Sequence, residues 1–398
     1  MSKKWTKLQT RVRDFSIFLL IAGMVTKEPV LFALSGGGFF LLLFSLWWCK
    51  YALKGILVNI DFTKKRIFPG ESTTVKMVIQ CSKLVLPPAM KLTMNTSKEM
   101  NIEGLTLLEE TVTDRFWTRM FGIKPRKTLI YEYKVFPNKR GVYHIYEMLI
   151  EIKDPTGLGK IVAKKPVKAE LIVFPAFIEA LPPKANLKGI EGNHQVKRLI
   201  HDDLSFFIGS RGYQMGDPLN RIDWKATARA GKLHTKHFAF TSQKQLILVG
   251  NLRTQEKWYL GNDPIVIERV IGLMAGLIRW CTANGYPYEW MFNIKNPYTK
   301  QVYHHKCKAD NKELVRNLER LGRLKSYTMM NVEDVFVHLR ETTYESAVIL
   351  VVTNFVTQQM ELEWKRQMEA GNTIWVIDPS AEQIEVYPYL MRKGVAIL

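Results

Sequence analysis

The stretch QLILVGNL, residues 245–252, is a short apolar run that ends near an asparagine. Three similar runs follow it: PYEWMFNI at 287–294, SAVILVVTNF at 346–355 and TIWVIDP at 373–379. Segments with helical character separate these runs, at 265–283, in patches between 311 and 341, and at 358–370. Short apolar strands that alternate with helices predict an α/β domain over residues 244–398, with a mostly parallel sheet covered on both faces.

Residues 55–180 carry a different pattern. The segments that define it are STTVKMVIQ at 72–80, KTLIYEYKVFP at 127–137, GVYHIYEMLIEIKDP at 141–155 and AELIVFP at 169–175. Apolar and polar residues alternate in them, strong β formers are common, and turns separate them. This pattern predicts an antiparallel β-sandwich of the immunoglobulin-like kind, with about seven strands. Residues 181–243 are then a linker that contains a charged motif.

Residues 1–54 predict a cytoplasmic N-terminus followed by a two-helix membrane hairpin. Phe15–Val25 is an apolar run of eleven residues, and Val30–Cys49 adds twenty residues without a charge. The second run is long enough to cross a membrane, whereas the first gives about 16 Å of helix against about 30 Å of hydrocarbon. Lys27 and Glu28 between the runs would be costly at mid-bilayer, so we expect them in a turn at the far interface, with Pro29 opening the second helix.

Basic residues flank both outer ends of this hairpin. They are Lys3, Lys4, Lys7, Arg11 and Arg13 before it, and Lys50, Lys54, Lys64, Lys65 and Arg66 after it. The positive-inside rule places both ends in the cytoplasm, which predicts a two-pass protein of a bacterial inner membrane with the bulk of the chain cytoplasmic. A cleaved signal peptide is the alternative, but no small-x-small cleavage site follows the first run, and a second apolar segment does.

Composition indicates the cellular compartment of the protein but does not identify its function. The formal net charge of +20 suits either an anionic partner or the cytoplasmic face of an anionic membrane. The four cysteines, at positions 49, 81, 281 and 307, form no CxxC pair. This spacing gives no disulfide framework and fits a reducing compartment.

The charged motif RGYQMGDPLNRIDWKATARAGKL, residues 211–233, contains two aspartates among several basic residues. Gly216-Asp217-Pro218 is a turn signal. If the residues after it are extended, Ile222 and Trp224 share one face of a strand while Asp223 faces the other way. The basic side chains that could surround the two carboxylates are Arg211, Arg221, Lys225 and Arg229.

Three interpretations of this motif stay open. Because arginine pairs with carboxylates in a bidentate manner, the favoured one is an internal clamp between the β and α/β domains. Some of the charges could instead dock an acidic partner protein, or bind nucleic acid, since aromatic and basic residues occur together. A catalytic carboxylate pair is disfavoured, because the arginines would hold both aspartates ionised and leave no general acid.

The motif resembles the signature of the bacterial domain of unknown function 58 family, R-x-Y-x-x-G-D-x-x-R-x-I-D-W-K-x-x-A-R. The matching residues are Arg211, Tyr213, Gly216, Asp217, Arg221, Ile222, Asp223, Trp224, Lys225, Ala228 and Arg229. RGVY at 140–143 and DPTGLGK at 154–160 resemble two further elements of that family. So many residue types at fixed spacing make the resemblance specific, and it covers most of the chain.

The resemblance implies a membrane-anchored protein with a von Willebrand factor A-like domain, often associated with MoxR-type AAA+ ATPases. It therefore implies a non-enzymatic adaptor or assembly factor that binds client proteins, with no cofactor and no nucleic acid. A metal-dependent adhesion-type binding protein is the first alternative. A hydrolase with an unrecognised site is the second, although the chain shows no nucleophile, base and orienter in a motif context.

The strand ends are where ligands of such a sheet gather, here around Asn251, Asn354 and Asp378. Many A domains are known to hold Mg²⁺ with D-x-S-x-S after the first strand, since a hard cation needs oxygen ligands. The corresponding residues here are Asn251-Leu252-Arg253-Thr254-Gln255, and Asn354 likewise stands where an acid would serve. We expect no bound metal, because amides replace carboxylates and Arg253 adds a positive charge.

Histidines offer no better metal site. His234 and His237, with His201-Asp202-Asp203 upstream, have a spacing that does not place both histidines on one face of a strand. His304-His305 near Cys307 is no stronger, so surface histidines are the favoured interpretation. The sequence contains no Walker-type GxxxxGK[ST] motif, which disfavours an intrinsic NTPase.

Overall fold

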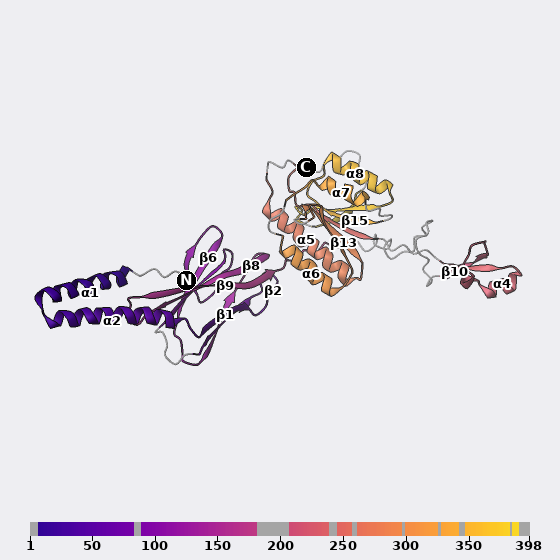
Figure 1. Ribbon diagram of the computed structural model, residues 1–398. Helices are drawn as coiled ribbons and strands as arrows, with labels where there is room; N and C mark the ends of the chain where they lie inside the picture. The colour runs from indigo at the N-terminus through magenta and orange to yellow at the C-terminus, as the bar shows by residue number, and fades with distance from the viewer. Residues whose placement is uncertain are drawn as a thin grey trace. The chain divides into compact units, whose positions relative to one another are not determined.

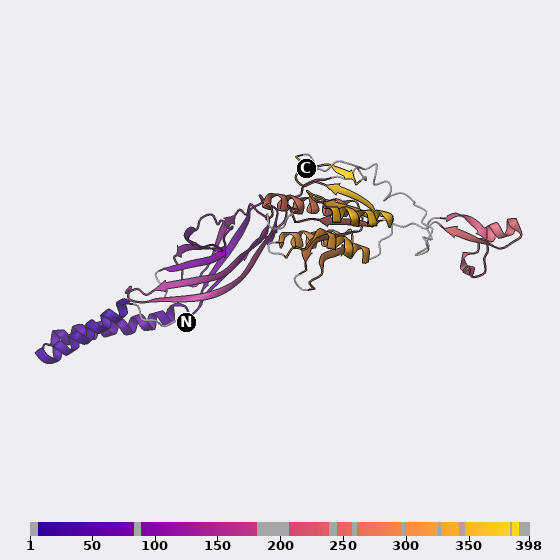
Figure 2. The same cartoon turned by 90° about the horizontal axis from the view of Figure 1, so that it is seen from above.

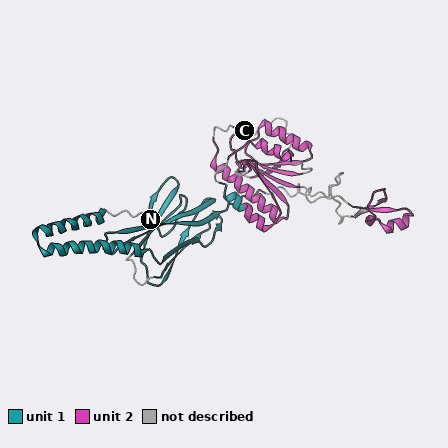
Figure 3. Cartoon of the chain, viewed as in Figure 1, with its two compact units in different colours: residues 1–176, 318–325 teal, residues 177–317, 326–398 magenta. Residues whose placement is uncertain are grey.

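The computed structural model describes residues 7–82, 89–180, 207–238, 245–256, 261–296, 299–324, 328–341, 347–382 and 384–389. The chain divides into two compact units (Figure 3), of which the first is Met1–Ala176 with Leu318–Lys325 and the second is Phe177–Asn317 with Ser326–Leu398. The coarse architecture is as predicted, because a helix pair precedes a β-rich domain and a mixed α/β domain follows.

The helix pair consists of α1 (Lys7–Thr26) and α2 (Pro29–Ala52), which lie antiparallel (Figure 1). The Ser35 hydroxyl donates to the backbone oxygen of Ser16 over 2.9 Å, and Gln9 Nε2 donates to Ser45 Oγ over 3.0 Å. α1 is longer than its apolar run because the polar residues before Phe15 continue the helix. Within the described residues, α2 alone is long and apolar enough to cross a membrane.

The β domain consists of two sheets. The smaller one has the order β1-β3-β7, with strands Ile56–Phe62, Thr73–Cys81 and Thr128–Val135, all antiparallel. The larger one has the order β2-β9-β8-β4-β6-β5, with strands Arg66–Ile67, Lys160–Val173, Gly141–Lys153, Met90–Ser97, Asp114–Phe121 and Thr106–Glu110. The described residues thus form nine strands where the sequence indicated about seven.

One apolar core joins the two sheets and the end of α2. Alternate residues of β3, such as Val75 and Met77, face alternate residues of β4, such as Leu92. Trp48 and Ala52 of α2 belong to the same core. The second helix is therefore packed into the β domain rather than merely tethered to it.

The α/β domain has one sheet of order β14-β13-β12-β15-β16-β17. The strands are Val302–Cys307, Tyr288–Lys295, Leu246–Gly250, Val348–Val352, Thr373–Ile377 and Val386–Pro388. The four central strands are parallel and the two outer ones are antiparallel. In chain order this is 3-2-1-4-5-6, so the winding reverses between β12 and β15.

Helices cover the two faces of this sheet (Figures 1 and 2). They are α5 (Pro264–Ala283), α6 (Asn311–Gly322), α7 (Val332–Glu341) and α8 (Gln358–Glu369). α7 and α8 share a core with one face, through Phe336 and Trp364 against Ile247, Ile349 and Ile374. Because helices cover both faces of the sheet, the polar loops at the strand ends are where a ligand-binding site is expected.

Candidate functional site

Residues 207–238, here called the signature module, form a hairpin with a helical insertion. β10 (Phe207–Gly212) pairs with β11 (His234–Phe238), and a short 3₁₀ turn (Leu219–Arg221) and α4 (Trp224–Ala230) lie between them. Two glycines have the backbone angles that the connections need: Gly216 has φ +110° in the turn, and Gly231 has φ +65° where α4 ends.

Arg211 and Asp217 form a bidentate pair within the module. Arg211 Nη1 donates to Asp217 Oδ2 over 2.9 Å, and Nη2 donates to Oδ1 over 2.7 Å. The backbone N–H of Gln214 and the hydroxyl of Thr235 also donate to this carboxylate, at 2.9 and 3.3 Å. These hydrogen bonds, with that from Arg211 the strongest, lower the pKa of Asp217, so it is ionised at neutral pH.

Asp223 caps α4 and does not lie in a strand. Its Oδ1 accepts from the backbone N–H groups of Lys225 and Ala226, each at 3.1 Å, and its Oδ2 accepts from the Ser210 hydroxyl. The bond from Ser210, followed by that from Ala226, lowers the pKa of Asp223. The expectation that Ile222 and Trp224 share one face is wrong, because the chain enters a helix at Trp224. Ile222 is 6% exposed and Trp224 is 69% exposed.

These bonds fasten the hairpin to its own helix. The partners named above for Asp217 and Asp223 lie inside the module, and none belongs to the β domain or to the six-stranded sheet of the α/β domain. The tyrosine of the signature takes part through its backbone, since Tyr213 N–H donates to the oxygen of Leu233 over 2.9 Å. The charged residues therefore explain why the module has its shape.

The outside of the module combines apolar and basic side chains. Four large apolar residues are exposed: Met215, Leu219 (70%), Trp224 and Leu233 (45%). Exposed basic residues accompany them, namely Lys225, Arg229, Lys232 and Lys236. Exposed apolar side chains beside basic ones are the composition of a binding surface.

A second polar site lies where the central strands of the α/β sheet end. Asn251, Asn293 and Thr353 follow in register at the ends of β12, β13 and β15. Asn251 Oδ1 accepts from Asn293 Nδ2 (2.9 Å) and from the backbone N–H of Arg253 (3.0 Å), while its Nδ2 donates to Thr353 Oγ1 (3.0 Å). The three side chains are at most 2% exposed. They form a buried neutral network that ties three strands together.

Arg253 lies above this network. Its Nη1 donates to Asn331 Oδ1 over 3.0 Å, its Nη2 donates to the backbone oxygen of Glu256, and its guanidinium stacks over Phe355 with 5.9 Å to the ring centre. Asn354 is near as predicted, and donates from Nδ2 to the backbone oxygen of Thr254 over 2.8 Å. The oxygen of Asn251, at the first ligand position of the motif, already accepts two N–H groups.

The other predicted strand-end residues contribute less. Gln255 is exposed, and Asp378 accepts from the backbone N–H of Ser380 over 2.7 Å in the turn after β16. Within the described ranges, no group of three or more His, Cys, Asp or Glu residues is placed to hold a metal. The absence of a bound metal stays a prediction.

A buried acid with two histidines was missed by the sequence reasoning. Glu289 of β13 is 3% exposed, His304 Nε2 lies 2.7 Å from its Oε2, and His304 Nδ1 lies 3.2 Å from His338 Nε2. Burial, and then the nearby His304, lower the pKa of His338. The surface interpretation is therefore wrong for His304, whose side chain is 12% exposed. The signal was a lone acid in the apolar strand YEWMFNI, because a buried carboxylate needs partners.

Of the remaining histidine candidates, the structure describes the side chains of His234 and His305. His234 Nδ1 contacts the backbone oxygen of Lys232 at 2.8 Å, and His305 packs on the ring of Trp290 with 4.7 Å between centres. The side chain of His237 and the residues His201-Asp202-Asp203 lie outside the described part of the chain.

The two upstream elements of the resemblance have structural contacts in the first unit. Arg140 of RGVY donates from Nη1 to the backbone oxygens of Leu321 (2.9 Å) and Leu324 (2.8 Å). In DPTGLGK, a Cβ on Gly159 would lie 2.6 Å from Ser45 Oγ and 2.7 Å from Gln9 Nε2. Glycine is required there because the loop touches both helices of the pair.

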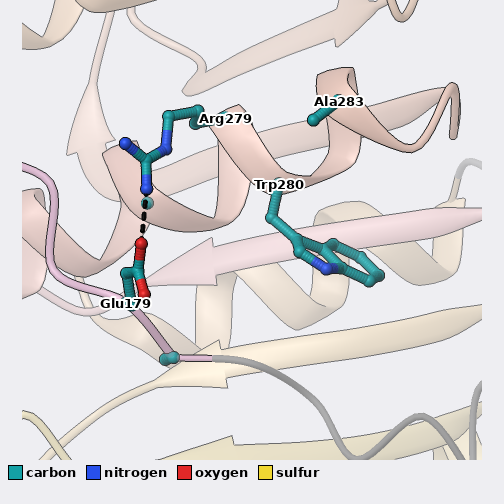
Figure 4. Close-up of a pocket in the computed structure, with 6 residues that line it drawn as sticks. Glu179, Arg279, Trp280 and Ala283 are labelled. Atoms are coloured by element: carbon teal, nitrogen blue, oxygen red, sulfur yellow. Dashed lines mark hydrogen bonds and ion pairs between the residues drawn. The ribbon is translucent and has the colours of Figure 1, made fainter.

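A small hollow lies where residues 177–180 run along α5 (Figure 4). Its volume is about 180 Å³, and Arg279 on its rim donates to Glu179 Oε1 over 2.6 Å. A Cβ on Gly276 would meet the backbone oxygen of Ile178 at 2.0 Å, so the glycine allows this segment to pack on the helix. Small-molecule sites usually occupy about 300 to 1,000 Å³, so we assign this hollow to packing.

Comparison with known proteins identifies one protein family and one curated relative. Residues 209–386 match the family model described as "Protein of unknown function DUF58". The matched part includes the signature motif, and the match confirms the resemblance that the motif carries. A curated relative, the uncharacterised protein YeaD of Bacillus subtilis (strain 168), is 25% identical over 297 residues, which are 72% of this chain and 69% of the relative.

Solved structures resemble only part of the chain. A non-cellulosomal cohesin from Archaeoglobus fulgidus is 13% identical, covers 29% of this chain and 90% of its own, and has a TM-score of 0.20. The sixth cohesin of scaffoldin B from Acetivibrio cellulolyticus is 11% identical, covers 29% and 98%, and has a TM-score of 0.21. Likenesses at these TM-scores carry no assignment.

Proposed function

We propose that this chain is a membrane-tethered, non-enzymatic adaptor or assembly factor. It binds client proteins through a von Willebrand factor A-like α/β domain and the signature module, in partnership with a MoxR-type AAA+ ATPase. The observation that carries the proposal is the exposed apolar set of the module, Met215, Leu219, Trp224 and Leu233, on a frame whose carboxylates are bound internally.

The make-up of this surface favours a protein partner. Tryptophan anchors commonly dominate protein interfaces, and basic residues around them favour a partner with an acidic rim. Of the four exposed apolar residues, Trp224 alone has a ring on which a nucleic-acid base could stack, whereas single-stranded nucleic acids stack successive bases on several rings, which argues for a protein partner. Alanine in place of Trp224 and Leu219 should therefore remove binding without changing the frame.

The strand-end site supports a binding role over catalysis. The winding reversal between β12 and β15 is where ligands of such sheets usually bind. Here Asn251, Asn293 and Thr353 are engaged with one another, and none of the three is a titratable acid or base. Because the oxygen of Asn251 is already bound by two N–H groups, the metal-dependent alternative is the weaker one.

The membrane part of the proposal is a two-pass anchor in the bacterial inner membrane, with both domains in the cytoplasm. It is supported by the length and apolarity of α2 and by the antiparallel partner α1. In intact cells, an impermeant thiol reagent should label Glu28→Cys, and it should label Lys168→Cys of the β domain only after permeabilisation. Labelling of Lys168→Cys in intact cells would contradict this topology.

The binding role is tested with a double variant, Leu219→Ala with Trp224→Ala, in the full chain. Ile265→Ala with Leu362→Ala removes two exposed apolar side chains from helices of the α/β domain and serves as the control. Affinity purification from detergent-solubilised membranes, read by quantitative mass spectrometry, should recover an AAA+ ATPase with the wild type and the control but not with the module variant.

Two results would count against this role. Equal recovery with the module variant would exclude the module as the docking surface. A lower melting temperature of that variant alone would show that these side chains pack against the chain itself.

A further inference from the structure

One end of the β domain, here called the helix-side end, is the end joined to α1 and α2. Strand register defines it, because Met90 of β4 pairs with Phe121 of β6 and with Ile152 of β8. The loop directly after β8 contains Gly159, which lies against Ser45 of α2. In Figure 1 the two helices leave the domain at this end.

Basic side chains gather at the helix-side end. Lys54 follows α2, Lys124, Arg126 and Lys127 lie in the loop from β6 to β7, and Lys153 is the last residue of β8. All five are exposed. If α2 crosses a membrane, these charges lie at its surface, where they are attracted by anionic lipids.

A hollow of about 680 Å³ opens at this end of the larger sheet. Three cationic side chains line it, Lys91, Arg119 and Lys153, together with Thr118, Thr156 and the carboxylate of Glu151. Its volume lies in the range of small-molecule sites. Cationic side chains are the groups that pair with a phosphate, and here they outnumber the two carboxylates of the lining, Glu151 and Asp154.

Asp154 adds a negative charge to the lining of this hollow. This residue lines the same hollow and is 3% exposed. Its Oδ2 accepts from the Thr156 hydroxyl over 2.8 Å, but its Oδ1 is buried without a hydrogen-bond partner. Because this oxygen is closed to solvent, Asp154 contributes a fixed negative charge to the lining and no acceptor for a ligand.

We propose that this hollow binds the headgroup of an anionic phospholipid, with its phosphate held by Lys91, Arg119 and Lys153. Phosphatidylglycerol has this chemistry, since its headgroup carries one net negative charge, on the phosphate. The proposal rests on membrane anchoring through α2, and it adds a specific lipid site to that anchor.

Native mass spectrometry of the full chain provides the test. The protein is equilibrated in detergent with an equimolar mixture of phosphatidylcholine and phosphatidylglycerol, and the retained lipids are counted. The wild type should retain phosphatidylglycerol in preference. A variant with Lys91→Gln, Arg119→Gln and Lys153→Gln should bind it at least about tenfold more weakly, because three cations near the headgroup are lost.

The matched control is Lys76→Gln, Lys134→Gln and Lys168→Gln, which removes the same charge from exposed positions away from the helix-side end. It should retain phosphatidylglycerol like the wild type. The single change Lys153→Gln should give an intermediate loss, which guards against a folding defect in the triple variant.

Three results would overturn the proposal. They are unchanged retention in the triple variant, an equal loss in the control, and release of the lipid by glycerol phosphate in solution, which would make a free phosphate ester the ligand. Alkaline extraction of membranes tests the anchor separately. It would remove a chain that is not anchored, whatever lipid that chain retains in detergent.

Discussion

Replacement of Asn251 by alanine removes the centre of the buried network in the α/β domain. Three hydrogen bonds are lost, from Asn293 Nδ2, from the backbone N–H of Arg253 and to Thr353 Oγ1. The Arg253 N–H loses its acceptor, at about 1 to 3 kcal/mol, and the other two bonds contribute about 0.5 to 1.5 kcal/mol each. The domain should therefore lose about 2 to 6 kcal/mol of stability.

Hydrogen exchange of the full chain in detergent measures this loss locally. Since each 1.4 kcal/mol is a factor of ten, amides of β12 and β13 in Asn251→Ala should exchange at least about thirtyfold faster than in the wild type. The control is Asn354→Ala, whose side chain is half-buried and donates to the oxygen of Thr254, and which should change exchange less than about tenfold. If amides in Asn251→Ala exchange at the wild-type rate, or if both variants change exchange equally, the network does not stabilise the domain as argued.

Three further predictions follow from the same structure. Titration of the full chain with Mg²⁺ or Mn²⁺ in a calorimeter should show no stoichiometric binding, because Asn251 stands where an acid would serve, and a one-to-one isotherm would contradict this. Asp223→Ala should speed exchange in α4, whereas Asp223→Asn should keep most of the protection, because asparagine also caps helices. In the wild type, that protection should persist down to the ordinary carboxyl pKa of 3.8 and be lost as the pH falls through the lower pKa values of folded Asp217 and Asp223. Because the folded pKa of His338 lies below 6.5, the unfolded state takes up a proton first as the pH falls through 6.5, so the α/β domain should melt at a lower temperature at pH 5.5 than at pH 7.5. His338→Gln should reduce that difference, and an unchanged pH dependence would exclude His338 as its source.

Periodicity was sufficient for the larger elements of the fold. The helical runs predicted at 265–283 and 358–370 correspond closely to α5 (Pro264–Ala283) and α8 (Gln358–Glu369). The turn at Lys27-Glu28 separates α1 from α2 as predicted. These signals are local and repeat over many residues, so single exceptions do not hide them.

The signature module was harder to predict because its helix has only seven residues. Asp223 before a run of helix formers and Gly231 after it are a cap signature at each end. Ile222 and Trp224, spaced by two, suggested a strand instead. A short helix has too few turns for its periodicity to correct such an error.

Pairings between distant residues could not be predicted at all. Asn293 and Glu289 are recognisable as polar residues in an apolar strand, and such residues need partners. The sequence does not say that those partners are Asn251 and His304. The same holds for Arg140, whose guanidinium binds backbone oxygens about 180 residues further along the chain.

Photo-crosslinking from position 224 tests directly whether the signature module binds another protein. A photo-reactive amino acid replaces this residue in the full chain, the membranes are irradiated, and the adducts are identified by mass spectrometry. We expect a crosslink to a different protein, an AAA+ ATPase or a client, which is absent when the same group replaces Ile265. Crosslinks that stay within the chain, or the same adducts from both positions, would contradict the claim that the signature module is a docking surface.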